Sequence, residues 1–156
     1  MSWKRRLEPR LRPLIHIGMR QLRGLTLGVR GLVTDAEGRV LLVEHTYTHG
    51  WFLPGGGVER GETAEAALAR ELVEEAGVRL TAPARLLSVH SNDANHRGDH
   101  ILVYRCEHWE ACEATSRGEI AQIGWFAAET LPDGIKPGHR RRIEEAFGGR
   151  APNSLW

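Results

Sequence analysis

The sequence predicts a single α/β domain in which strands and helices are mixed in irregular order. Its 156 residues fit one compact domain, since domains commonly take about 100–200 residues. Apolar residues make up 41% and charged residues 26%, close to the globular average, so the chain can bury a core. Strand-like segments rich in Val, Leu and Ile are not separated by regularly spaced helices, which argues against a doubly wound parallel sheet.

The first 24 residues are a basic extension that precedes the domain. They hold seven Lys or Arg residues and a single acid, Glu8. From Pro13 the apolar residues recur at helical spacing up to Gly24, which predicts a short amphipathic helix. Its basic face could contact an acidic lipid, RNA or a partner protein, or be solvated while the helix packs on the domain.

The domain is expected over residues 25–148, followed by a C-terminal tail at 149–156. It begins with two strand-like runs, 25–34 and 39–44, joined by the turn signal Asp35-Ala36-Glu37-Gly38, which predicts a β-hairpin. After a loop at 45–50, the segment Trp51-Phe52-Leu53-Pro54 leads into three consecutive glycines. Later strands are expected at 82–89, 100–107 and 120–126, and a closing helix at 136–147.

The Ala- and Glu-rich segment 64–76 gives the clearest helix signal. On a helical wheel Glu71, Glu74 and Glu75 share an arc of about 100°, apart from the apolar face. Like charges three or four residues apart destabilise a helix by about 0.2–0.5 kcal/mol per pair. Arg70 cannot neutralise all three, so a divalent cation would complete the site. Oxygen ligands favour Mg²⁺, with Mn²⁺ as an alternative, and a solvated acidic face is the other interpretation.

Gly55, Gly56 and Gly57 stand before this helix, and Thr63 is placed to cap it. Glycines let the backbone approach a ligand closely. A glycine loop leading into an acidic helix is what a metal-bridged phosphate site requires. A P-loop would need a Gly-Lys-Ser/Thr ending, which this sequence does not have.

The segment Gly56 to Val78 resembles the Nudix box, G-x5-E-x7-R-E-U-x-E-E-x-G-U with U aliphatic. It matches every fixed position: Gly56, Glu62, Arg70, Glu71, Leu72, Glu74, Glu75, Gly77 and Val78. The flanking segments 51–55 and 119–126 also look like family segments, so the resemblance covers about residues 25–132.

The resemblance implies an α/β/α sandwich around a mixed central sheet. It also implies hydrolysis of a diphosphate bond in a nucleoside diphosphate linked to a further group. Glu74 and Glu75 would be the main metal ligands, joined by the carbonyl of Gly55, and Glu71 would bind metal or act as general base.

Two further roles follow from the same resemblance. Arg70 would orient a box carboxylate through an ion pair and Glu62 would be a supporting acid, which makes Glu71, Arg70 and Glu75 the expected catalytic residues. An additional metal ligand from a distant segment is expected at Glu119, with Glu113 and Asp99 as alternatives.

Substrate contacts are expected from three segments. His45 and Tyr47, before the box, could stack on a nucleobase or belong to the core. Asn95 and His100, in the polar stretch 90–100, could hold a ribose or base, or lie in a solvated loop. The basic cluster 136–142 could bind phosphate or form an exposed helix face.

Two other functions are compatible with the sequence. One is removal of phosphate from a nucleoside triphosphate or an RNA 5′ end, for which the basic N-terminus would be favourable. The other is a non-catalytic nucleotide-binding module, although the box acids are complete. The net charge of +1 gives no general argument for nucleic-acid binding.

The protein is expected to be cytoplasmic and to have a small nucleotide diphosphate as its substrate. No apolar run approaches the ~20 residues of a membrane span, and the N-terminus lacks the apolar stretch of a secretory signal. Cys106 and Cys112 are expected as reduced thiols, since their spacing fits neither a disulfide framework nor a zinc site. A homodimer is compatible with the resemblance.

Overall fold

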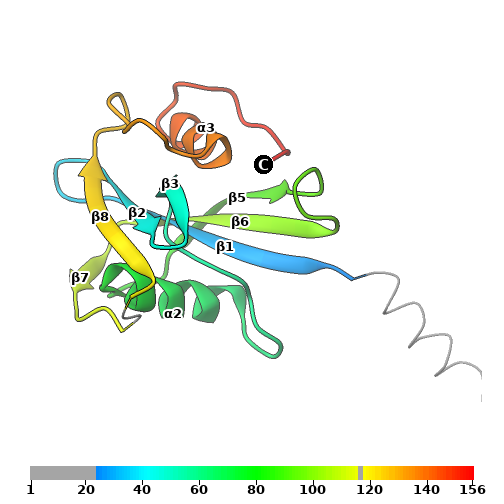
Figure 1. Cartoon of the computed structure of the whole chain (residues 1–156), viewed down its shortest axis with the longest axis horizontal. Helices are drawn as coiled ribbons and strands as arrows, with labels where there is room; N and C mark the ends of the chain where they lie inside the picture. Colours follow the sequence, from blue (N-terminus) through cyan, green and yellow to red (C-terminus); the bar gives the residue numbers. More distant parts are fainter. Residues whose placement is uncertain (1–23, 116–117) are drawn as a thin grey trace, which may run out of the picture.

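The computed structural model describes residues 24–115 and 118–156, so the predicted N-terminal helix lies outside the described residues. Helices α2 (Ala64–Ala76) and α3 (Pro137–Ala146) lie on opposite sides of the strands (Figure 1). This arrangement confirms the expected mixed α/β fold with helices on both faces. With 13 and 10 residues, neither described helix could span a membrane.

The strands form two sheets of three strands and one small sheet of two. The first has the order β1 (Thr26–Val33), β6 (Asp99–Cys106), β5 (Arg85–Ser91), and the second has the order β3 (Thr48–Phe52), β2 (Val40–His45), β8 (Ile120–Phe126). The third, which the sequence did not predict, pairs β4 (Val78–Leu80) with β7 (Trp109–Ala111). The first sheet is mixed, because β1 runs parallel to β6 while β5 runs antiparallel to it.

The predicted hairpin of residues 25–34 and 39–44 is wrong in its pairing. Both segments are strands, and the turn forms, since the Gly38 amide donates to the Asp35 carbonyl at 3.0 Å. The strands share one bridge, Thr34 with Val40, and then separate into different sheets. The turn signal therefore predicted the chain reversal correctly. However, β1 pairs along its length with β6, which lies far along the chain.

The buried side chains divide into two cores, one on each face of the strands. Leu68 and Leu72 of α2 pack against Val33 of β1, whereas Leu32 of the same strand packs in the other core with Ile143 of α3. Adjacent residues of a strand point to opposite faces, so β1 is buried on both sides. Each such Leu or Ile contributes about 1.5–3 kcal/mol by its burial.

Helix α2 has the bounds that the sequence predicts, because both of its ends carry local signals. The Thr63 hydroxyl accepts a hydrogen bond from the Ala66 amide at 3.1 Å, and Gly77 ends the helix in the left-handed conformation with φ 61°. Packing of Leu68 and Leu72 then fixes the rotation of the helix, which turns Glu71 and Glu75 toward the glycine loop.

Candidate active site

The glycine loop is held between β1 and α2 by contacts to both backbone groups of Gly55. Its amide donates to Oε2 of Glu75 at 2.8 Å, and its carbonyl accepts a hydrogen bond from Nη1 of Arg30. Gly55 has φ 138°, and a Cβ there would collide with the carbonyl of Val29. Only glycine lets the loop lie this close to β1, with the Gly55 amide on the carboxylate of Glu75 and the Gly55 carbonyl on the guanidinium of Arg30.

Glu75 is a buried acid at the centre of the site. Only 8% of it is exposed, and its Oε1 lies 3.7 Å from Nε2 of His45. Burial raises the pKa of Glu75 to about 7, with the charges of Glu71 and Glu119 acting in the same direction. The Gly55 amide and the charge of Arg30 oppose this shift.

Arg70 gathers the other acids of the box around one guanidinium. Its Nη1 lies 2.7 Å from Oε1 of Glu71 and 3.4 Å from Oε2 of Glu74, and its Nε lies 3.0 Å from Oε1 of Glu62. Its Nη2 also donates to the carbonyl of Gly57 at 3.2 Å. Hydrogen bonds to Glu62 and Glu71 raise the pKa of Arg70 above its usual range. The guanidinium thus ties α2 to the glycine loop.

The donor atoms of this site fit a hard divalent cation, although they are not assembled as a cage. Within residues 24–115 and 118–156, no three His, Cys, Asp or Glu side chains converge on one point suited to a metal. Instead Glu71 and Glu74 pair with Arg70, and Glu75 faces Gly55. The Glu71 carboxylate lies directly against Gly56, where the Cβ of any other residue would overlap it. All the donors are oxygens, as Mg²⁺ or Mn²⁺ prefers.

Of the three distant acids, Glu119 has the clearest electrostatic link to the box. The Thr46 amide donates to its carbonyl at 2.9 Å, which ties the start of β8 to the turn between β2 and β3. From there the charge of Glu119 raises the pKa of Glu75. The Asp99 carboxylate is used elsewhere, since it accepts from the Thr26 hydroxyl at 2.6 Å and from Nδ2 of Asn92 at 2.7 Å.

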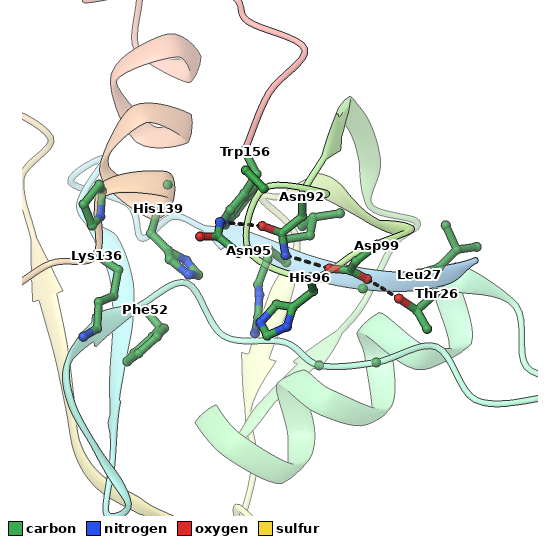
Figure 2. Close-up of a pocket in the computed structure, with 18 of the residues that line it drawn as sticks. Thr26, Leu27, Phe52, Asn92, Asn95, His96, Asp99, Lys136, His139 and Trp156 are labelled. Atoms are coloured by element: carbon green, nitrogen blue, oxygen red, sulfur yellow. Dashed lines mark hydrogen bonds between the residues drawn. The ribbon is translucent and has the colours of Figure 1, made fainter. Parts of the chain in front are cut away.

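A cavity of about 820 Å³ adjoins the glycine loop (Figure 2). Its walls come from the start of β1, residues 56–57, the loop 92–99, the beginning of α3 and Trp156. Along one wall a chain of hydrogen bonds runs from Asn95 through Asn92 and Asp99 to Thr26. This cavity is large enough for a nucleotide-sized ligand beside the box.

The structure does not bring the four predicted substrate residues into this one cavity. Asn95 lines it, whereas His100 is paired with Leu27 on β1 and is not among its lining residues. His45 is buried against Glu75, and Tyr47 is 73% exposed and stacked on His45 with ring centroids 5.0 Å apart.

The opposite wall is built by the beginning of α3 and by the C-terminal tail. Lys136, His139 and Arg141 line the cavity, but Arg142 is buried and forms an ion pair with Glu145 at 2.7 Å. The cluster 136–142 is therefore not simply an exposed basic helix face. No pattern in the sequence pointed to two of the lining residues, Arg30 and Trp156.

The tail reaches the cavity by pairing with the end of β5. The Ser91 amide donates to the Ser154 carbonyl at 2.8 Å, and the Trp156 amide donates to the Ser91 carbonyl at 2.9 Å. Arg141 donates to the Trp156 carbonyl, and Arg142 donates to the Leu155 carbonyl at 3.0 Å. These bonds hold the Trp156 indole against Gly138 and His139.

The fold and this site define an α/β/α hydrolase of the class that acts on acid anhydrides. The NUDIX domain model matches residues 24–146, and the chain belongs to the Nudix family. A MutT-like protein of Streptomyces ambofaciens is 31% identical over 82% of this chain and 80% of its own length. A putative 8-oxo-dGTP diphosphatase of Bacillus subtilis is 28% identical over 80% of this chain and 81% of its own. The crystal structure of a MutT NUDIX hydrolase from Burkholderia pseudomallei superposes with a TM-score of 0.67 and 29% identity, covering 78% of this chain and 97% of that one.

Proposed function

We propose that this enzyme hydrolyses a diphosphate bond in a nucleotide-type substrate, with Mg²⁺ as its cofactor and Mn²⁺ as an alternative. The carboxylates of Glu71, Glu74 and Glu75 and the carbonyl of Gly55 would hold the metal. The observation that carries this proposal is the hydrogen bond from the Gly55 amide to the buried Glu75, which ties the carboxylate of α2 to the glycine loop whose next two residues line the cavity. Glu119 is the further ligand we propose, because its charge acts on Glu75.

The bound metal would supply charge neutralisation on the diphosphate oxygens and a lowered pKa of the attacking water. The chain contributes a base and its support. Glu71 is the proposed base, since its carboxylate faces Gly56 at the edge of the cavity, where a water beside the substrate could give up a proton. Arg70 holds that carboxylate in position at 2.7 Å. Arg30 donates a hydrogen bond to the Gly55 carbonyl and so helps to hold the loop in place.

The substrate we place first is a nucleoside diphosphate linked to a further group, bound in the cavity next to the box. Asn95 would contact it directly from the loop 92–99. His45 and Tyr47 would act at its edge, with His45 against Glu75 and Tyr47 exposed on top of it. His100, on β6, would contribute through the strand that supports this loop.

A nucleoside triphosphate is the second candidate, and the relative whose name includes 8-oxo-dGTP favours it. Cleavage at the same carboxylates would then release diphosphate or phosphate from the triphosphate. Binding of an RNA 5′ end depends on the basic extension, which lies outside the described residues.

The test is a panel of nucleoside diphosphate sugars, dinucleotides and nucleoside triphosphates incubated with Mg²⁺, with the products separated by chromatography, since cleavage of a nucleoside diphosphate sugar yields a nucleoside monophosphate and a sugar phosphate. Glu75→Gln should lower kcat by about 100-fold or more, since it removes a ligand from the charge-stabilising centre. Glu65→Gln is the matched control, because Glu65 is an exposed acid in the first turn of the same helix. Hydrolysis of no compound, or equal rates for wild type and Glu75→Gln, would refute the proposed activity.

A further inference from the structure

The beginning of α3 presents hydrogen-bond donors to the cavity at the wall opposite Asp99. The first turn of a helix has amides without intrahelical acceptors, and Lys136 at the N-cap makes no capping bond with its side chain. Pro137 has no amide hydrogen, so the orphan donors are the amides of Gly138 and His139. Neither amide has a hydrogen-bond acceptor within the part of the chain that the structure describes.

His139 adds a side-chain donor at the same place. It is only 5% exposed, and its Nδ1 accepts a hydrogen bond from the Leu53 amide at 3.0 Å. In a neutral imidazole whose Nδ1 accepts, the proton is on Nε2. Burial, together with the charges of Arg30, His45 and Lys136, keeps the pKa of His139 well below its usual range, so the ring is neutral. Its Nε2 has no partner in residues 24–115 and 118–156, and the ring lines the cavity (Figure 2).

Lys136 brings a positive charge without a counter-charge. Its ammonium lies over the ring of Phe52, 5.6 Å from the centroid, and forms no ion pair with a carboxylate of the described residues. Figure 2 shows Lys136, Phe52 and His139 together on one side of the cavity. The wall therefore combines two backbone amides, one imidazole N–H and one ammonium, and all of these groups donate.

We propose that these donors form a subsite for a phosphate group of the substrate. A phosphate has a negative charge and several acceptor oxygens, which matches a helix N-terminus with an adjacent cation. A ribose or a nucleobase would leave the Lys136 ammonium uncompensated.

The phosphate at this subsite is one beyond the two that flank the cleaved bond. Those two belong at the carboxylates of α2, and the rings of His45 and Phe52 lie between Glu75 and His139. His45 is in contact with Glu75, and the Phe52 ring centroid is 5.2 Å from both His45 and His139. The inference rests on the proposed function and narrows it to substrates with a third phosphate, either a triphosphate or a diphosphate with a separate phosphate ester.

The first experiment measures anion binding without catalysis. The protein in EDTA is titrated with methyl phosphate and followed by the ¹H–¹⁵N amide signals of Gly138 and His139. We expect both signals to shift, and Lys136→Met to weaken binding by about tenfold through loss of a charge-assisted contact. Arg79→Gln, which removes an exposed cation from β4, should leave binding unchanged. Unmoved amides, or equal binding by Lys136→Met and wild type, would overturn the subsite.

A second variant tests the role of the His139 imidazole in binding without disturbing the fold. His139→Asn keeps an acceptor near the Leu53 amide and removes the Nε2–H, so it should weaken methyl phosphate binding while the Leu53 amide signal stays in place. Unchanged binding with that signal in place would remove His139 from the subsite.

The source of the phosphate is settled by kinetics on matched substrates. Lys136→Met should raise KM about tenfold for a nucleoside triphosphate and for a diphosphate sugar with an added phosphate ester, but not for the same sugar without it. Equal changes in KM for all three substrates would show that the subsite does not bind a phosphate of the substrate. The subsite would then be a site for free phosphate. Hydrolysis of none of them, with methyl phosphate binding intact, would refute the proposed function and not the subsite.

Discussion

Replacing Glu75 by Gln should stabilise the metal-free protein while it lowers kcat by about 100-fold or more. The pKa of Glu75 is about 7 in the folded protein and 4.5 when the side chain is solvated. The unfolded chain therefore loses this proton first, and the native state is penalised as the pH rises from about 4.5 to about 7. Gln is neutral, and its side-chain oxygen can still accept the bond from the Gly55 amide.

The size of the effect follows from the difference between the two pKa values. Each unit corresponds to about 1.4 kcal/mol, so the ionised Glu75 lowers the free energy of unfolding by about 3 kcal/mol at pH 8. At pH 5 the penalty is under about 1 kcal/mol, since the folded carboxyl is protonated and the unfolded one only partly ionised. For a domain of this length, 3 kcal/mol corresponds to about 6–12 °C in Tm.

The measurement is thermal and urea unfolding of wild type and Glu75→Gln in EDTA at pH 5, 6, 7 and 8. We expect the two proteins to differ little at pH 5 and Glu75→Gln to be more stable at pH 8. Adding Mg²⁺ at pH 8 should raise the Tm of wild type and leave that of the variant unchanged. Glu65→Gln, an exposed acid on the same helix, should show no such pH dependence.

The reasoning would be refuted by a Glu75→Gln protein that is equal to wild type, or less stable, at pH 8 in EDTA. That result would mean that the carboxylate is already well compensated by Arg30 and the Gly55 amide. A stability gain of the same size at pH 5 and pH 8 would equally contradict it, because such a gain would not come from ionisation.

Two further predictions test the loop and the core. Gly55→Ala should lower the free energy of unfolding by about 2 kcal/mol or more, since the new Cβ would overlap the Val29 carbonyl at a φ of 138°, whereas Gly57→Ala, which meets nothing within 4 Å, should cost under about 1 kcal/mol. Urea unfolding would compare the two, and equal costs would contradict the close packing of the loop. In the native protein a thiol reagent at pH 8 should modify Cys112 and spare Cys106, because burial leaves Cys106 1% exposed and raises its pKa to about 12. Rapid modification of both thiols before unfolding would show that this core opens.

The parts of the fold that the sequence predicted are those with local signals. Helix α2 has both its N-cap, Thr63, and its C-terminal glycine, Gly77, in the sequence itself. Strand β8 also has the predicted bounds. The hairpin was wrong because a turn specifies where the chain reverses, while β1 takes its partner from residues more than 70 positions away. The three-residue strands β4 and β7 are too short to show a periodic pattern.

In the candidate site, too, the residues that belong to a local sequence pattern were predicted, and those that depend on tertiary contacts were not. The box acids lie within one loop and one helix, so a contiguous pattern was enough to find them. Arg30 was missed because it is one basic residue within a strand, and its role depends on the approach of the Gly55 loop to that strand. The cluster 136–142 was ambiguous, since a sequence of bases does not tell which of them face a cavity and which, like Arg142, are buried in an ion pair.

Under the proposed function, the pairing of the tail with β5 would put the control of substrate choice and the chemistry at separate places in the chain. The box lies in residues 56–78, whereas one wall of the adjoining cavity depends on Trp156, which is held there by hydrogen bonds to Ser91 and Arg141. A chimera that exchanges only the tail of this enzyme with that of a relative would keep every box acid and yet present a different surface to the ligand. Under the proposed function, the box would set the reaction, and exchange of the tail residues around Trp156 would change the substrate without altering the box acids.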